Sequence, residues 1–311
     1  MKKLYLSILA ILIPAILYCT VFFANDPYGY FKTNSETKTT GDLIGKMLDY
    51  KNNKYDAIIV GDSRIVRYDL SDLSESTGYN YINMAYGGCI TNEMASLVEW
   101  CFEKQNTELK EIVIVTSFYN MNVLLQQDRV ASTEKVIKSP FSYAFNMETA
   151  EMMINSLKKE DSPVTETKKE LTEEEKAENF KSHENSMSYY LDEYVCDYGV
   201  IERLNEICKK CTEAGIEVKI ILPPWWQGYY ELLQQRGLLE ILDEYKAILS
   251  ENATVYDFEY AECPLSDRYD EFIDYTHFSG ETSKLVFKAF TEEDIPDCRI
   301  WKNGSFENNQ E

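Results

Sequence analysis

The stretch "DAIIVGDS", residues 56–63, decides the fold of this 311-residue chain. Its apolar centre is β-branched and unbroken, which is typical of a strand covered on both faces of a sheet. The run ends at Gly61, and Asp62 and Ser63 open the turn that follows. A serine held there presents its hydroxyl at the edge of the sheet, or it caps a following helix. Both interpretations are open from this segment alone.

Further apolar runs downstream also read as strands, namely residues 79–88, 111–120, 216–224 and 253–260. Segments with helical spacing separate them, such as residues 201–211, which Gly215 ends, and residues 229–250. This alternation predicts an α/β fold with helices on both faces of a mainly parallel, five-stranded sheet. Such sheets carry their sites at the carboxyl ends of the strands. Ser63, Gly88 and Tyr119-Asn120 all fall there.

An uncharged apolar run covers residues 4–24, directly after Lys2 and Lys3. As a helix it would span about 31 Å, close to the thickness of a bilayer core. Phe22 and Phe23 do not fit the small residues of a cleavage site, so we expect a retained anchor. The lysines should stay in the cytoplasm. The predicted domains are therefore a membrane anchor at residues 1–24 and an extracytoplasmic domain over residues 25–311, with its globular part ending near Phe290.

The charged residues of the chain give a formal net charge of -22. This argues against nucleic-acid binding, because phosphate contacts need Lys and Arg. Residues 157–185 are nearly all polar and read as an exposed, partly helical insertion, with His183 as a solvated side chain at its end. The last ten residues read as a frayed tail. "CKKC" at residues 208–211 lacks a second ligand pair, so we expect packed and surface thiols and neither a metal nor a cofactor.

The stretch "DYTHFSG", residues 274–280, holds one of the chain's two histidines. In an Asp-x-x-His block the aspartate can fix the tautomer of the imidazole, which leaves its other nitrogen as a base. A serine hydroxyl such as that of Ser63 is a poor nucleophile until a base takes its proton. Asp274 and His277 are therefore candidate partners of Ser63. A plain surface loop is the alternative for an isolated block of this kind.

Together the two blocks resemble those of the SGNH hydrolase superfamily, the GDSL-type esterases. The resemblance implies a three-layer, flavodoxin-like fold with Ser63 as nucleophile, His277 as base and Asp274 as its orienting group. The family's second block supplies a glycine, which Gly88 matches in "NMAYGG". Its third block reads Gly-x-Asn-Asp, from which "TSFYNMN" (116–122) departs. Asn120 is the first candidate for the oxyanion amide, beside the backbone N–H groups of Ser63 and Gly88, and Asn122 is the second.

The anchor, with "GDSR", "ILPPWW", "VYDFEY" and "DYTHFS", looks like one membrane-tethered branch of that superfamily. It includes D-alanyl transfer proteins of teichoic-acid modification and alginate-type O-acetyltransferases. The resemblance implies an esterase or acyltransferase acting on O-acyl groups of a cell-envelope polysaccharide, beside a membrane-bound O-acyltransferase. Two alternatives are a catalytically silent scaffold for such an acyltransferase and a structural envelope protein in which the "GDS" is accidental.

Several side chains are weaker candidates for substrate binding. Arg64 is adjacent to the nucleophile and could bind an anionic group or form a structural salt bridge. Tyr119 and Asn122 flank the candidate amide. Trp225 and Trp226, with two tyrosines in "PPWWQGYY", could form a platform for a sugar, or they could pack into the core.

Overall fold

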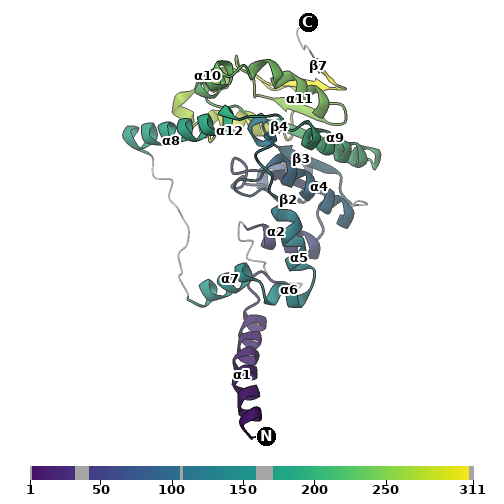
Figure 1. Ribbon diagram of the computed structural model, residues 1–311. Coiled ribbons are helices and arrows are strands. Elements are labelled where there is room, and N and C mark those ends of the chain that lie inside the picture. Colours follow the sequence, from purple (N-terminus) through teal and green to yellow (C-terminus); the bar gives the residue numbers. More distant parts are fainter. Residues whose placement is uncertain (1, 32–41, 106–107, 159–170, 308–311) are drawn as a thin grey trace. The chain divides into compact units, whose positions relative to one another are not determined.

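The computed structural model describes residues 2–31, 42–105, 108–158 and 171–307 (Figure 1). Within the first helix, the side chains of residues 2–9 and 11 are outside this description. The chain divides into two compact units. One, the helical unit, comprises Met1–Asn53 and Arg129–Lys169; the other, the sheet unit, comprises Lys54–Asp128 and Glu170–Glu311. This division differs from the predicted one, which separates only residues 1–24 from the rest.

Helices make up the described part of the helical unit: α1 (Lys2–Asn25), α2 (Leu43–Asn52), α5 (Arg129–Ile137), α6 (Pro140–Ala144) and α7 (Met147–Leu157). The buried Tyr143 explains why segments far apart in sequence join here. Its hydroxyl accepts a hydrogen bond from the backbone N–H of Tyr28 at 3.0 Å and donates one to Asp26 at 3.2 Å. Residues 26–31 and 42–53 therefore fold with residues 129–158.

The prediction of a helix over residues 4–24 is confirmed by α1. When only the residues with described side chains are considered, no helix is long and apolar enough to cross a membrane. The predicted anchor falls partly on residues 4–9 and 11, whose side chains lie outside that set.

The sheet has seven strands in the order β2-β1-β3-β4-β5-β6-β7. The five predicted runs are all present and pair in parallel: β1 (Ala57–Gly61), β2 (Tyr81–Asn83), β3 (Glu111–Val115), β4 (Glu217–Leu222) and β5 (Thr254–Asp257). Gly61 is level with Val115, and Val115 with Ile221. The loops after β1, β3 and β4 therefore leave the sheet at one edge.

Two additional strands correct the prediction of five strands and of a frayed tail. β6 (Arg299–Lys302) pairs antiparallel with β5, and β7 (Ser305–Glu307) pairs antiparallel with β6. The folded part of the chain thus continues past Phe290. Trp301 explains this, because its side chain is buried and its indole N–H donates to Asp257 at 3.1 Å.

Helices cover both faces of the sheet, as predicted. Ala57 and Ile59 of β1 point to one face, where they share a core with Leu73 of α3 (Ser71–Thr77) and Val286 of α12 (Gly280–Lys288). Successive strand residues alternate in direction, so Ile58, between Ala57 and Ile59, faces the other side of the sheet. There α4 (Thr91–Gln105) contacts β1, α9 (Tyr198–Glu213) contacts β4, and α11 (Leu242–Leu249) packs on α9.

The predicted charged insertion lies partly outside the described residues. Its first described residues, 157–158, end α7, and residues 173–185 belong to α8 (Glu173–Asp192). This helix starts with a capping box in which Thr172 and Glu175 exchange side-chain and backbone hydrogen bonds. This helix contacts α10 (Gln227–Gln235) in the same sheet unit. The polar segment therefore ends in a helix that packs on the fold.

Candidate active site

Ser63 lies in the turn directly after β1, and Gly61 makes that turn tight. A Cβ at Gly61 would lie 2.8 Å from Ile65 Cγ2 and 3.0 Å from the carbonyl oxygen of Val115. β2 and β3 lie on opposite sides of β1. The loops after them diverge at this point, where open α/β sheets bind ligands. Ser63 is exposed there and does not cap a helix, because the next helix begins only at Ser71.

The three predicted triad residues come together in the sheet unit. Ser63 Oγ lies 2.8 Å from His277 Nε2, although 214 positions separate the two residues. His277 Nδ1 lies 2.7 Å from Asp274 Oδ2. Serine, imidazole and carboxylate thus form one chain of hydrogen bonds, in the order that general-base activation of a serine requires.

Asp274 is buried and fixed by its own loop. Its Oδ1 accepts hydrogen bonds from the backbone N–H groups of Thr276 and His277, both at 2.8 Å. Burial alone would raise the pKa of Asp274, but the hydrogen bond and charge of His277, with these backbone donors, hold it below its usual range. Asp274 is therefore ionised at neutral pH, which suits it to orient His277 and to stabilise an imidazolium.

Asp62, next to the serine, is the centre of a second buried cluster. Arg64 forks onto its carboxylate, with Nε 2.9 Å from Oδ1 and Nη2 2.7 Å from Oδ2. The amide of Asn120 donates to Oδ2 at 2.9 Å. Burial opposes the charge of Asp62, but Arg64 and these hydrogen bonds hold the pKa of Asp62 below its usual range. Of the two predicted roles for Arg64, the structure has the salt bridge.

The candidate oxyanion donors follow three adjacent strands. Ser63 follows β1, Gly88 lies in the loop after β2, and Asn120 lies in the short 3-10 helix Phe118–Met121 after β3. Gly88 has φ +65°, a conformation that glycine adopts without strain. One N–H of the Asn120 amide is used by Asp62, and a primary amide has two. The contact with Asp62 therefore needs only one of the two N–H groups of this amide.

Asn122, the second candidate amide, binds the backbone of its own unit. Its Nδ2 donates to the Tyr190 carbonyl at 3.2 Å, and its Oδ1 accepts from Leu124 N at 3.1 Å. It thereby ties the loop after β3 to the end of α8. Tyr119 is half-buried, with its ring 5.8 Å from that of Trp225 and 5.9 Å from that of Tyr190.

The aromatic segment after β4 packs mainly into the core. Trp225, Tyr229 and Tyr230 are buried, and the rings of Trp225 and Tyr229 stack at 4.1 Å. Burial leaves these three no open face for a sugar, so packing is the correct one of the two predicted roles. Trp226 is half-buried, with its ring 4.9 Å from those of Phe180 and Tyr275.

His183 is not the solvated side chain that its polar surroundings predict. Its Nε2 lies 3.4 Å from Asp274 Oδ2, and its ring lies 6.2 Å from that of His277. Both histidines of the chain therefore converge on one carboxylate. The only signal in the sequence is that Lys176, Phe180 and His183 recur at the spacing of one helix face.

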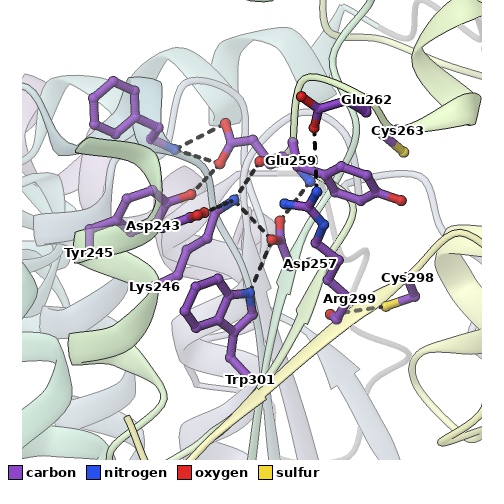
Figure 2. Close-up of polar contacts among 12 residues, drawn as sticks. Asp243, Tyr245, Lys246, Asp257, Glu259, Glu262, Cys263, Cys298, Arg299 and Trp301 are labelled. Atoms are coloured by element: carbon purple, nitrogen blue, oxygen red, sulfur yellow. Dashed lines mark hydrogen bonds and ion pairs between the residues drawn. The ribbon is translucent and has the colours of Figure 1, made fainter. Parts of the chain in front are cut away.

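A buried ionic cluster lies after β5 and was not predicted (Figure 2). Lys246 of α11 is fully buried, and its Nζ lies 2.9 Å from Asp257 Oδ2 and 2.6 Å from the carbonyl oxygen of Glu259. The indole of Trp301 shares the same Asp257 oxygen. The buried ammonium of Lys246 thus joins α11 to the end of β5.

The carboxylate of Glu259 extends this cluster toward the site. It accepts the backbone N–H of Phe118 at 3.0 and 3.2 Å, and also the hydroxyl of Tyr245. Burial, only partly offset by Lys246, Tyr245 and Phe118, raises the pKa of Glu259 to about 7. Because Phe118 starts the short helix that carries Asn120, Glu259 helps to hold that loop against β5.

All eight cysteines are free thiols. Cys208 and Cys211 are both buried on α9, so of the packed and surface thiols that the sequence predicts, this pair has only packed ones. In the part of the chain that the structure describes, no group of three or more His, Cys, Asp or Glu side chains could hold a metal ion.

Comparison with models of known protein families and with curated proteins finds no match for this chain.

Proposed function

We propose that this chain is an acyl hydrolase or acyltransferase that uses Ser63 as nucleophile, His277 as base and Asp274 as orienting carboxylate. The observation that carries the proposal is the hydrogen-bonded line of these side chains, with contacts of 2.8 and 2.7 Å. Residues 214 positions apart have no local reason to meet in this way. The contact favours an enzyme over an envelope protein with an accidental "GDS".

The acyl step follows from the order of the groups. Ser63 Oγ attacks the carbonyl carbon of an ester while its proton passes to His277 Nε2. The imidazolium that forms is stabilised by the ionised Asp274. When the tetrahedral intermediate collapses, His277 returns the proton to the leaving alcohol, and the acyl group stays on Ser63. Water or a second hydroxyl, deprotonated by His277, then removes the acyl group.

The oxyanion of the intermediate needs donors of its own. We assign these to the backbone N–H groups of Ser63 and Gly88 and to the second N–H of the Asn120 amide. Loss of one such donor costs about 3 kcal/mol of transition-state stabilisation, a hundredfold or more in rate. The order of the first five strands, 2-1-3-4-5, supports this assignment, because flavodoxin-like folds carry their sites beside β1 at this edge.

The substrate class and location rest on the resemblance to membrane-tethered SGNH proteins. We propose acetyl or similar O-acyl groups on a cell-envelope polysaccharide, with α1 as the membrane anchor and the site outside the cytoplasm. Whether water or a sugar hydroxyl takes the acyl group decides between hydrolase and transferase. Both outcomes use the same acyl-Ser63.

A serine-directed fluorophosphonate probe tests the proposal. The probe should label the wild-type chain, whereas Ser63→Ala should abolish labelling and His277→Ala should slow it at least a hundredfold. Ser186→Ala is the matched control, because Ser186 is an exposed serine of α8, and it should label like wild type. Mass spectrometry of the adduct identifies the labelled residue.

Two results would overturn the proposal. One is wild-type protein, folded by circular dichroism, that takes up no probe; this would favour the catalytically silent scaffold. The other is label on a residue other than Ser63. Incubation of an acetylated oligosaccharide with and without an acceptor sugar then separates hydrolysis from transfer.

A further inference from the structure

Two imidazoles approach the same oxygen atom of Asp274. His277 Nδ1 lies 2.7 Å from Oδ2, and His183 Nε2 lies 3.4 Å from it. The centroids of the two rings are 6.2 Å apart, and the ring planes are inclined at 76°. A Ser-His-Asp triad uses only one of these histidines.

The position of His183 is fixed by the packing of α8 on the loop that holds Asp274. Lys176, on the same face of α8 as His183, donates to the carbonyl of Tyr269 at 2.7 Å. Phe180 lies between them and contacts the rings of Trp226, Tyr269 and Tyr275. The His183 side chain is 33% exposed, and its Nδ1 is buried without a hydrogen-bond partner.

We propose that His183 shares the Asp274 carboxylate with His277 and thereby sets the pH range in which His277 acts as a base. This assignment of a positioning residue rests on the proposed function. When His183 is protonated, it takes up part of the negative charge that would otherwise stabilise the His277 imidazolium. Its charge also repels a second positive charge on the neighbouring ring. Protonation of each histidine therefore opposes protonation of the other.

Other titratable groups surround the pair and must be considered. Glu184 of α8 and Glu231 of α10 act on Tyr275 in the same loop. Burial first, and then these two carboxylates, raise the pKa of Tyr275 to about 12. Lys176 completes the set from α8. All of these groups are the same in wild type and in the variants, so a comparison of variants isolates the two imidazoles.

The chain has only two histidines, so proton NMR of the imidazole ring resolves the pair directly. In His183→Gln the only remaining ring is His277, and in His277→Gln it is His183. We expect loss of one ring to raise the titration midpoint of the other, and the two rises together to amount to about 0.5–2 pH units, the range that Coulomb's law gives for this ring separation. The coupling belongs to the pair, so the two rises should add up to its full value, and they divide between the rings according to which ring is protonated first.

Further variants separate charge sharing from packing. His183→Phe keeps a ring without charge, and it should raise the His277 midpoint as His183→Gln does. Asp274→Asn should lower both midpoints. Met187→Leu, on the same face of α8, is the matched control and should change neither. The acidic limb of the pH profile of fluorophosphonate labelling should move to higher pH with the His277 midpoint.

The inference is overturned if the His277 midpoint is the same, within 0.1 unit, in wild type and in both folded His183 variants. A summed rise below 0.1 unit in the two single-histidine chains would also overturn it. The titrations need no turnover, so they can fail while labelling of Ser63 succeeds. They can also succeed in a chain that the probe does not label, which keeps this inference distinguishable from the proposed function.

Discussion

The amide of Asn120 donates a hydrogen bond of 2.9 Å to the carboxylate of Asp62. This contact joins the turn after β1, which carries Ser63, to the loop after β3. The same amide is the proposed side-chain donor for the oxyanion. The residue thus links the position of the nucleophile to the position of the developing charge.

Replacing Asn120 with alanine should separate these two roles. We expect the rate of Ser63 acylation by an aryl acetate to fall about a hundredfold, the cost of one oxyanion donor. Stability should fall by only about 1 kcal/mol, because Asp62 keeps the donors of Arg64. Stopped-flow acylation and urea unfolding measure the two quantities. All four tryptophans lie in the sheet unit, so their fluorescence follows its unfolding.

Asn122→Ala is the matched control for that experiment. Asn122 is buried and satisfies backbone groups of Leu124 and Tyr190, so its loss should destabilise the sheet unit by about 2 kcal/mol. Its acylation rate per folded molecule should stay within about threefold of wild type. The opposite pattern, a slow Asn122 variant and a fast Asn120 variant, would move the oxyanion role to Asn122.

Arg64→Met should be strongly destabilising at neutral pH. It leaves the buried Asp62 carboxylate without its ion-pair partner, which costs about 3–5 kcal/mol. In wild type the folded pKa of Asp62 is depressed, so its stabilising contribution is present above the unfolded pKa of about 4 and is lost on acidification. In the variant, protonation removes an unpaired charge, so the deficit should shrink as the pH falls from 7 toward 4.

Urea unfolding at several pH values checks this prediction, and Arg203→Met serves as control. Arg203 pairs with Glu99 near the surface, where both side chains are more than a third exposed, so its loss should cost no more than about 1 kcal/mol. Equal deficits for the two arginine variants would show that the Asp62–Arg64 pair is not a special buried contact.

Asp274→Asn tests whether the carboxylate acts on the imidazole or only on the loop. The amide oxygen can still accept the backbone N–H groups of Thr276 and His277, so the loop should keep its shape. Without the negative charge, the His277 tautomer that accepts the serine proton is no longer favoured. In serine proteases the same change lowers kcat about 10⁴-fold. We expect probe labelling to slow by about 10³-fold or more, with unfolding changed little; unchanged labelling would remove Asp274 from the mechanism.

Much of the sheet was predictable because its strands are buried on both faces. β1, β3 and β4 are unbroken apolar runs, and each was predicted within a few residues. The run at residues 79–88 gives a regular strand only at Tyr81–Asn83. Met84 and Tyr86 still donate to carbonyls of β1, so the extended chain continues where the regular ladder ends.

The β6–β7 hairpin was missed although its turn has a signal. Asn303 and Gly304 have φ of 52° and 74° and connect the two strands. Asn-Gly is the preferred pair for such two-residue turns. The flanking runs are only four and three residues long and contain arginine, lysine, serine and glutamate, so their pattern is that of a tail. What makes them strands is the burial of Trp301 against β5, a contact that no local pattern reveals.

The residues of the candidate site also divide into those that the sequence predicts and those that only the fold reveals. Ser63, Asp274 and His277 were predictable because each half of the triad is a short local block. His183 and Glu259 act through contacts with segments 91 and 141 residues away, Asp274 and Phe118 respectively. Nothing in the sequence beside His183 says that α8 folds back onto the Asp274 loop. Long-range contacts of this kind need the fold before they can be seen.

The last prediction concerns Glu259. Burial raises its pKa from 4.5 to about 7 in the folded chain. Between these values the folded state holds a proton that the unfolded state has lost, so stability should fall as the pH rises through this window. The full loss is about 3 kcal/mol. Glu259→Gln removes this dependence, because the amide stays neutral and its oxygen can still accept from Phe118 and Tyr245.

Urea unfolding from pH 5 to pH 8 provides the measurement. Relative to wild type, the unfolding free energy of Glu259→Gln should rise by about 3 kcal/mol across this range. Glu262→Gln is the matched control: Glu262 lies in the same loop, its side chain is 78% exposed, and its variant should run parallel to wild type. If Glu259→Gln also runs parallel, Glu259 is ionised in the folded chain throughout this range. The buried ammonium of Lys246 would then hold its charge, and the cluster after β5 would be an ion network at all these pH values.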